Sequence, residues 1–188
     1  MNVYDFDKTI FYPDSTVTLL KFLLRRYPRA FYEQAEAIAL GIWKNYKTGD
    51  PTPMKEAALS VLAYVPDIDA LVDEFWEENL CRIARWYLDR KKPDDLIISA
   101  SPEFHLRPIA DMLGFALIAT PTDKYSGQIT GLNCRGEEKV RRFLLEYPGE
   151  SIDEFYSDSL SDEPLAKMAK KAFLVKGGHR ITPWPFKD

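Results

Sequence analysis

The chain has 188 residues, of which 46% are hydrophobic and 13% aromatic, and its formal net charge at pH 7 is -4. This length suits one substantial core, with or without an inserted subdomain, and excludes two full enzyme domains. The acidic balance argues against a nucleic-acid scaffold, which needs a dense cationic surface, so we expect no nucleic-acid partner.

The sequence also contains no stretch of the length and apolar character of a membrane span. Its N-terminus lacks the basic start and apolar run of a secretion signal. Cys81 and Cys134 are too few and too far apart for a disulfide framework or a four-ligand zinc site. We therefore expect a cytoplasmic protein with two free thiols and no membrane partner, either a monomer or a small homo-oligomer.

The first ten residues place two carboxylates, Asp5 and Asp7, directly after a short apolar start. Side chains alternate along a strand, so both would leave the sheet on the same side. At about 4 Å, two carboxylates repel by roughly 4 kcal/mol at an effective dielectric near 20. Such a pair needs a cation or a shared proton, although a solvated Asp-x-Asp turn is the alternative interpretation.

Residues 13–91 show helical periodicity throughout. Four helices are predicted, over residues 15–27, 28–47, 54–64 and 68–87. Asp14 and Ser15 can cap the first of them, and Pro28 suits the first turn of the second. Most of the aromatic residues at helical spacing are expected to lie in the core, with one or two at the mouth of a site. These residues are Trp43, Tyr46, Phe75 and Trp86.

After a polar break at residues 91–95, short apolar runs alternate with helical ones. Strands are predicted at residues 96–98, 115–118, 152–156 and 172–175, and helices at 103–113, 136–147 and 163–171. A Gly-rich ribbon is expected at residues 125–131. The tail from residue 177 is predicted to be irregular, with Trp184 and Phe186 packed onto the body.

This alternation is typical of βαβ units and a parallel sheet covered on both faces. We therefore predict an α/β fold with a three-layer, Rossmann-like core. The core comprises residues 1–12 and 92–188, and an all-helical cap subdomain, residues 13–91, is inserted in it.

Open parallel sheets bind ligands at the carboxyl ends of their strands, so the residues directly after each apolar run are candidates for a site. Acidic, hydroxyl and ammonium groups gather at these positions. They are Asp5 and Asp7 after the first run, Ser99 after residues 96–98, Asp158 and Asp162 after residues 152–156, and Lys139 near a helix start. Such a set suits a divalent metal and a phosphate, and hard oxygen ligands favour Mg²⁺.

These residues resemble the four motifs of the haloacid dehalogenase-like (HAD) superfamily, and within it the phosphoserine-phosphatase-like branch with a helical cap. In chain order the motifs read Asp5-Phe6-Asp7-Lys8-Thr9, Ile97-Ile98-Ser99, Lys139 and Ser157-Asp158-Ser159-Leu160-Ser161-Asp162. They span nearly the full chain, and an all-helical segment separates the first two. The order and context of all four make the resemblance specific.

The resemblance implies an HAD-like fold and a phosphatase of small phosphomonoesters. Asp5 would be the nucleophile that forms an aspartyl-phosphate, and Asp7 would be the general acid and base. Lys139, Ser99 and the main-chain N–H of Ala100 would hold the phosphate, with help from the dipole of the following helix.

The resemblance also implies Mg²⁺ as the cofactor. Its expected ligands are the carboxylate of Asp5, the main-chain carbonyl of Asp7 and the carboxylate of Asp158. Asp162 would hold a metal-bound water or orient Lys139. Positive charge is needed at this site because a phosphate dianion repels an anionic nucleophile.

Two motifs depart from the pattern of phosphoserine phosphatases. Ser157-Asp158-Ser159 replaces Gly-Asp-Gly, and Ser99-Ala100-Ser101-Pro102 replaces a Ser-Gly-Gly motif. Both changes affect loop shape and substrate fit. Asp14 lies where phosphoserine-specific members carry an acid that meets the substrate amino group, but it serves equally well as a helix cap.

Other interpretations remain open at this stage. A phosphotransferase or mutase would pass the same aspartyl-phosphate to an alcohol. A receiver-like signalling domain also uses a phosphorylated Asp, but it needs neither a helical insert nor a second Asp two residues on. An inactive phosphate-binding protein is a further possibility. His105 and His179 have no partner at ligand spacing and are interpreted as structural or surface residues.

Overall fold

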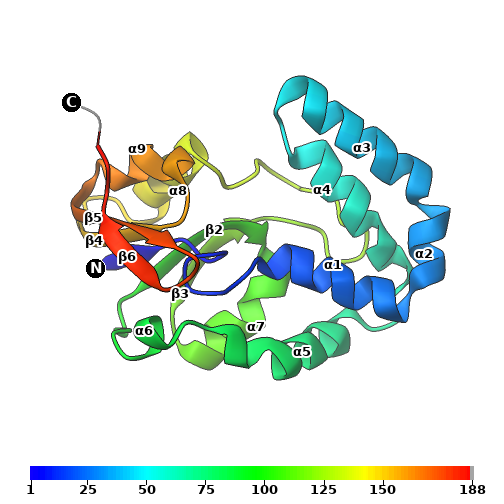
Figure 1. Cartoon of the computed structure of the whole chain (residues 1–188), viewed down its shortest axis with the longest axis horizontal. Helices are drawn as coiled ribbons and strands as arrows, with labels where there is room; N and C mark the ends of the chain where they lie inside the picture. Colours follow the sequence, from blue (N-terminus) through cyan, green and yellow to red (C-terminus); the bar gives the residue numbers. More distant parts are fainter. Residues whose placement is uncertain (187–188) are drawn as a thin grey trace.

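The computed structural model describes residues 1–186, which form a six-stranded sheet with helices on both faces (Figure 1). The strand order is β3-β2-β1-β4-β5-β6. Strands β1 to β5 are parallel, and β6 pairs antiparallel with β5. The predicted α/β class is therefore confirmed. The strands are Asn2–Tyr4 (β1), Leu96–Pro102 (β2), Ala116–Thr120 (β3), Ile152–Ser157 (β4), Ala169–Lys176 (β5) and Arg180–Pro183 (β6).

The two faces of the sheet carry separate hydrophobic clusters, because successive strand residues point in opposite directions. Val3 packs with Phe143 on the face covered by α8 (Glu137–Glu146) and α9 (Glu163–Ala166). Tyr4 belongs to the other cluster, with Ile109 of α7 (Glu103–Leu113). The central strands are thus buried on both sides, as their continuous apolar runs predict.

The segment between β1 and β2 contains only helices and 3₁₀ turns. Its α-helices are Ser15–Arg26 (α1), Pro28–Glu33 (α2), Ala35–Thr48 (α3), Thr52–Leu59 (α4), Ile68–Asn79 (α5) and Arg85–Leu88 (α6). The 3₁₀ turns are Ser60–Tyr64 (η1) and Leu80–Arg82 (η2). Helices α5 and α6 lie on the same face of the sheet as α7, whereas α3 and α4 stand away from the sheet (Figure 1). That residues 13–91 form a cap subdomain separate from the α/β core stays a prediction.

The predicted helix over residues 68–87 is interrupted after Asn79. The turn η2 follows, and Ile83 and Ala84 are extended because they pair with the loop that follows β1; helix resumes in α6 at Arg85. Ile83 forms an antiparallel bridge with Phe11, and the N–H of Ala84 donates to the carbonyl of Ile10 at 2.7 Å. These bonds tie the end of the helical segment to the loop that carries Asp5 and Asp7. The predicted helices over 28–47 and 54–64 are also interrupted, by a break at Gln34 and by η1.

The C-terminal region differs most from prediction. The helix predicted over residues 163–171 ends at Ala166, and β5 begins at Ala169, where it pairs with Ile152. The tail predicted to be irregular contains β6. Trp184 is buried as expected, but Phe186 is exposed. The predicted ribbon at residues 125–131 is a turn with one isolated bridge, between Thr122 and Ile129.

Candidate active site

The loop after β1 carries the two aspartates at the carboxyl edge of the sheet. The N–H of Asp5 donates to the carbonyl of Tyr156 at 2.8 Å, so this residue still runs beside β4. The chain then turns tightly, because the carbonyl of Phe6 accepts from the N–H groups of Ile10 and Phe11, each at 3.0 Å. Lys8 takes the left-handed conformation within this turn, with φ of 59°. The turn directs Asp5 and Asp7 into one cavity.

Lys139 and two carboxylates form a buried ion cluster. The Lys139 ammonium is 2.6 Å from Asp5 Oδ1 and 2.8 Å from Asp162 Oδ2, and the lysine side chain is 2% exposed. Ser157 donates to the same oxygen of Asp162 at 2.8 Å. Burial opposes the charged ammonium, but the carboxylates of Asp162 and Asp5 outweigh this effect and raise the pKa of Lys139. Lys139 is therefore a permanent positive charge at the site.

Asp5 has an unusually high pKa for a carboxyl group. Burial raises the pKa of Asp5 to about 7, against the lowering effect of Lys139, and the neighbouring Asp162 and Asp158 raise it further. Burial also raises the pKa of Asp158, and Asp162 adds to this effect. Carboxyl groups that raise one another's pKa in this way favour a bound cation, which would restore their charged forms.

Asp7 is oriented by residues of two neighbouring elements. Its carboxylate accepts hydrogen bonds from the Ser101 hydroxyl and from the N–H of Ser15, at the start of α1. Thr16 in turn lies 2.7 Å from the Ser101 hydroxyl, oxygen to oxygen. Burial raises the pKa of Asp7, and the charge of Asp14 raises it further. A carboxyl group with a raised pKa and a fixed direction suits proton transfer.

The second motif is arranged differently from its prediction. Strand β2 continues to Pro102, so Ser99 to Ser101 lie within the strand rather than after it. Ser99 is buried outside the cavity wall, and its hydroxyl accepts from the N–H of Ser101 at 3.0 Å. Ala100 and Ser101 do line the cavity. Ser101 was not selected from the sequence, and it reaches the cavity where β2 is irregular, between Ile98 and Pro102.

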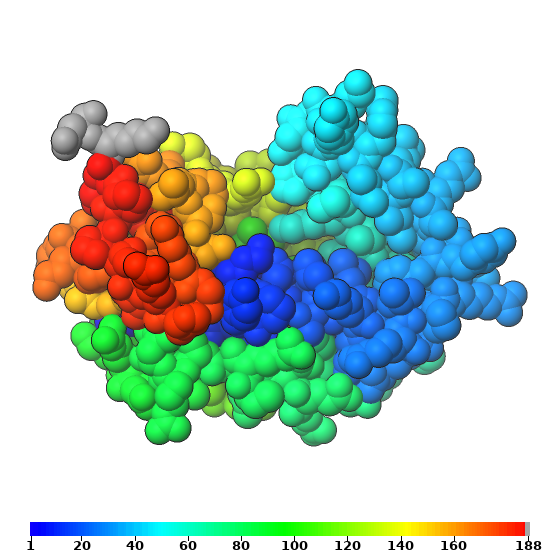
Figure 2. Space-filling model, in the orientation of Figure 1, coloured from blue at the N-terminus to red at the C-terminus, as the bar shows by residue number. Residues whose placement is uncertain are grey.

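The cavity has a volume of about 540 Å³ and brings together nearly all the predicted residues. Its wall includes Asp5, Asp7, Ala100, Lys139, Asp158 and Asp162. It lies in the hollow between the α3–α4 pair and the α8–α9 side of the sheet (Figure 2). The constellation predicted from four separate motifs therefore meets at one place.

The donor set of this wall fits Mg²⁺. Within residues 1–186, no three Asp, Glu, His or Cys side chains are already clustered at metal-binding distance. The predicted set does not need three, because it combines the carboxylates of Asp5 and Asp158 with a main-chain carbonyl. Mg²⁺ commonly binds one or two carboxylates and completes its shell with water and substrate oxygens.

Lys55 is a second cation at the site, and it comes from α4. Its ammonium donates to the carbonyl of Ala100 at 2.7 Å and to the Asn133 side chain at 3.0 Å. Burial lowers the pKa of Lys55, against the opposing charges of Asp7 and Asp14. In the sequence Lys55 is one of many helical lysines, and no local signal marks it. The ammonium links the helical segment directly to β2.

The remaining candidates have structural or surface positions. Asp14 accepts from the N–H of Val17 at 3.0 Å, so it caps α1, and it also lines the cavity. His105 is fully buried against Trp76, and His179 is exposed. Cys81 and Cys134 are both free thiols, as predicted.

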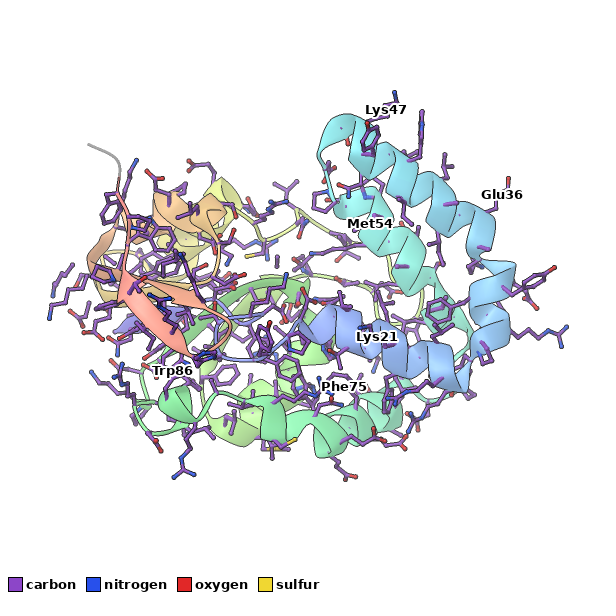
Figure 3. All side chains as sticks on the ribbon, in the orientation of Figure 1. Lys21, Glu36, Lys47, Met54, Phe75 and Trp86 are labelled. Carbon is purple, nitrogen blue, oxygen red and sulfur yellow. The ribbon has the colours of Figure 1, made fainter. Side chains whose placement is uncertain are left out.

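Two of the four aromatic residues expected in the core are instead on the surface. Trp43 is 56% exposed and Tyr46 is 83% exposed, and neither lines the cavity. Phe75 and Trp86 pack on the core side of α5 and α6 (Figure 3). The prediction was therefore wrong for α3, because helical spacing alone does not show which element covers a helix.

None of the helices within residues 1–186 combines the length and the apolar character needed to cross a bilayer.

Comparisons with known proteins agree with this architecture. A solved structure of a protein of unknown function from Bordetella pertussis Tohama I matches with a TM-score of 0.74 and 23% identity, over 92% of this chain and 87% of the other. A phosphoserine phosphohydrolase-like protein from Francisella tularensis matches with a TM-score of 0.54 and 19% identity, over 92% and 86% of the two chains. A probable phosphoserine phosphatase from Vibrio cholerae has a TM-score of 0.62 and 14% identity, over 91% and 55%.

These structural likenesses show a shared fold. No curated protein matches the sequence significantly. The family model of haloacid dehalogenase-like hydrolases, however, matches residues 3–167, which include all four motifs and the ion cluster around Lys139. The chain therefore belongs to the haloacid dehalogenase-like hydrolase family.

Proposed function

We propose that this chain is a Mg²⁺-dependent phosphatase that hydrolyses a phosphomonoester through an aspartyl-phosphate on Asp5. The observation that carries the proposal is the shared cavity, in which Asp5 contacts Lys139 at 2.6 Å and Asp7 and Asp158 lie in the same wall. Membership of a hydrolase family supports the reaction class. We propose further that the enzyme acts in the cytoplasm.

Asp5 is held in position for attack. Its Oδ1 accepts from Lys139, and its Oδ2 accepts from the Thr9 hydroxyl at 3.4 Å. Attack by a carboxylate oxygen on phosphorus forms the aspartyl-phosphate and breaks the ester bond to the leaving oxygen. Lys139 would stabilise negative charge on the phosphoryl oxygens, because its ammonium is buried and already directed at Asp5.

Asp7 would move the proton in both half-reactions. The bonds from Ser101 and Ser15 fix its carboxyl group, and its raised pKa favours a protonated form at the start. It would donate this proton to the leaving oxygen and later accept one from the water that hydrolyses the aspartyl-phosphate. The second transfer restores the starting protonation state.

Mg²⁺, held by the carboxylates of Asp5 and Asp158 and the main-chain carbonyl of Asp7, would supply the remaining positive charge opposite the phosphoryl group. The main-chain N–H of Ala100 would contribute a further donor to the phosphate, since Ala100 lies in the cavity wall. Asp162 would orient Lys139, which it contacts at 2.8 Å.

The direct experiment measures phosphate release from a panel of phosphomonoesters with Mg²⁺, with and without a chelator, for the wild type and Asp5→Asn. We expect chelation to remove activity and Asp5→Asn to lower kcat by at least about a thousandfold. Asp153→Asn is the matched control, because Asp153 is a surface carboxylate bonded to Lys170 and the N-terminus. Activity that survives both treatments would contradict the mechanism.

A second variant, Lys139→Met, tests the role of the lysine ammonium in the same assay. Loss of one positioned donor to the phosphoryl group should reduce kcat by about 10²- to 10³-fold. The variant also leaves two buried carboxylates without a counter-ion, so urea unfolding must be measured with the kinetics. Product analysis with added alcohols distinguishes hydrolysis from phosphotransfer, because a transferase would form a new phosphate ester.

A further inference from the structure

We infer that the substrate carries an apolar group, an alkyl chain or an aromatic ring, next to its ester oxygen, rather than the head group of an amino-acid or sugar phosphate. This inference rests on the proposed function and concerns the wall of the same cavity that faces away from the sheet. It depends on three features of that wall.

First, the wall formed by the helical segment is mostly apolar, and its polar members are Asp14, Thr16 and Lys55. Three helices contribute pairs of residues at spacings of three or four, so each helix turns one face to the cavity. The pairs are Val17 and Leu20 of α1, Ile38 and Ile42 of α3, and Met54 and Ala58 of α4. Ile38, Ile42 and Met54 belong to neither hydrophobic cluster of the sheet. Packing in the core therefore does not account for their apolar character.

Second, the two charged residues that the helical segment adds to this wall, Asp14 and Lys55, already have partners. Asp14 accepts from the N–H of Val17 and lies 3.5 Å from the Lys8 ammonium. Lys55 donates to Ala100 and Asn133. An amino-acid phosphate would have to compete with these contacts, and each contact given up carries a desolvation cost. An apolar group needs none of them.

Third, the cavity is larger than a phosphoryl group requires, and its apolar wall continues to the surface. About 540 Å³ is within the range of pockets that enclose a drug-sized ligand. Ile42 lies at the rim, because it lines the cavity and is still 52% exposed. Met54 lies on the neighbouring α4 (Figure 3). A chain of several carbons could therefore extend from the ester oxygen between these helices.

The first experiment compares kcat/KM for ethyl, butyl, hexyl and octyl phosphate with glycerol 3-phosphate and O-phosphoserine, all below micelle-forming concentrations and with Mg²⁺. We expect kcat/KM to rise about two- to fourfold for each added methylene that the wall covers. The two hydrophilic esters should rank with ethyl phosphate or below it.

The second experiment uses a matched pair on α3. Ile42 and Leu40 are 52% and 50% exposed, but only Ile42 lines the cavity. Ile42→Ser should lower the octyl-to-ethyl ratio of kcat/KM by about five- to tenfold. Leu40→Ser should leave that ratio unchanged, since its side chain does not face the substrate.

The outcomes separate the two proposals. Turnover that is flat or falls with chain length, or that is highest on O-phosphoserine, overturns the apolar substrate and leaves the phosphatase in place. Equal effects of the two serine variants overturn the role of the α3 wall. No turnover on any ester, with Mg²⁺ present, removes the proposed function and the inference together.

Discussion

Helices α5 and α3 come from one continuous helical segment and have similar apolar spacing, but α5 is largely buried and α3 is largely exposed. Helix α5 buries half of its twelve residues, including Phe75 and Trp76. Helix α3 has fourteen residues and buries only Gly41. The comparison separates two uses of an apolar helix: α5 stabilises the fold, whereas α3 presents apolar side chains to a cavity and to solvent.

The difference follows from what each helix meets. Phe75 packs edge-to-face on Phe22 of α1, and the Trp76 indole N–H donates to the carbonyl of His105 on α7 at 2.7 Å. Helix α5 thus packs against both α1 and α7. Helix α3 contacts mainly α4, and at Gly41 an added Cβ would lie 2.8 Å from the carbonyl oxygen of Pro53. Helix α3 is therefore covered only on the side that faces α4, and most of its other residues are exposed.

The largest expected effect tests burial directly. Phe75→Ala should lower the free energy of unfolding by about 3–5 kcal/mol, because it removes a fully buried ring from the packing between α1 and α7. Trp43→Ala, the matched aromatic truncation on α3, should change it by less than about 0.5 kcal/mol. Urea unfolding of both variants measures the contrast, and comparable losses would show that α3 is covered in solution.

The second expected effect concerns His105, a buried histidine that packs against α5. His105 stacks on Trp76, and neither ring nitrogen has a hydrogen-bond partner among the described residues. Burial lowers the pKa of His105 to about 3 from the ordinary 6.5. The unfolded chain therefore binds a proton below about pH 6.5 that the folded protein does not bind until about pH 3. This residue's contribution to stability is full above pH 6.5 and declines as the pH falls through that window.

His105→Leu should remove that dependence. Between pH 5.5 and 4.0, we expect the free energy of unfolding to fall less steeply in the variant, by about 1.4 kcal/mol per pH unit. The comparison uses slopes, so an overall change in stability from the substitution does not obscure it. His179→Leu is the control, since His179 is exposed. Parallel curves for wild type and His105→Leu would show that the imidazole is solvated in the folded protein.

The smallest effect concerns the contact that holds α3 in place. Gly41→Ala gains helix propensity but introduces a Cβ within 3.0 Å of the backbone of α4, so the two helices must separate. We expect a net loss of about 1 kcal/mol in the free energy of unfolding. Ala39→Leu, at an exposed position on the same helix, should be nearly neutral. A higher free energy of unfolding for Gly41→Ala would mean that Gly41 and the backbone of α4 are not in this close contact.

Much of the candidate site could be predicted because it depends on local order along the chain. Asp5 and Asp158 directly follow β1 and β4, Asp162 lies in the turn after Asp158, and adjacent parallel strands end at the same edge of a sheet. Ser101 and Lys55 could not be predicted in this way. Ser101 reaches Asp7 only because β2 runs past Ser99, and Lys55 reaches Ala100 only because α4 and the end of β2 line the same cavity.

The amino-acid sequence by itself determined the class of fold, the positions of most helices and strands, and the acids and lysine of the site. These features depend on periodicity and on neighbours a few residues apart. Only the tertiary structure decided that α5 is buried and α3 exposed, that the chain leaves helix at Ile83 to pair with Phe11, and that β6 completes the sheet. Burial depends on which distant segments meet an element, and no local pattern contains that information.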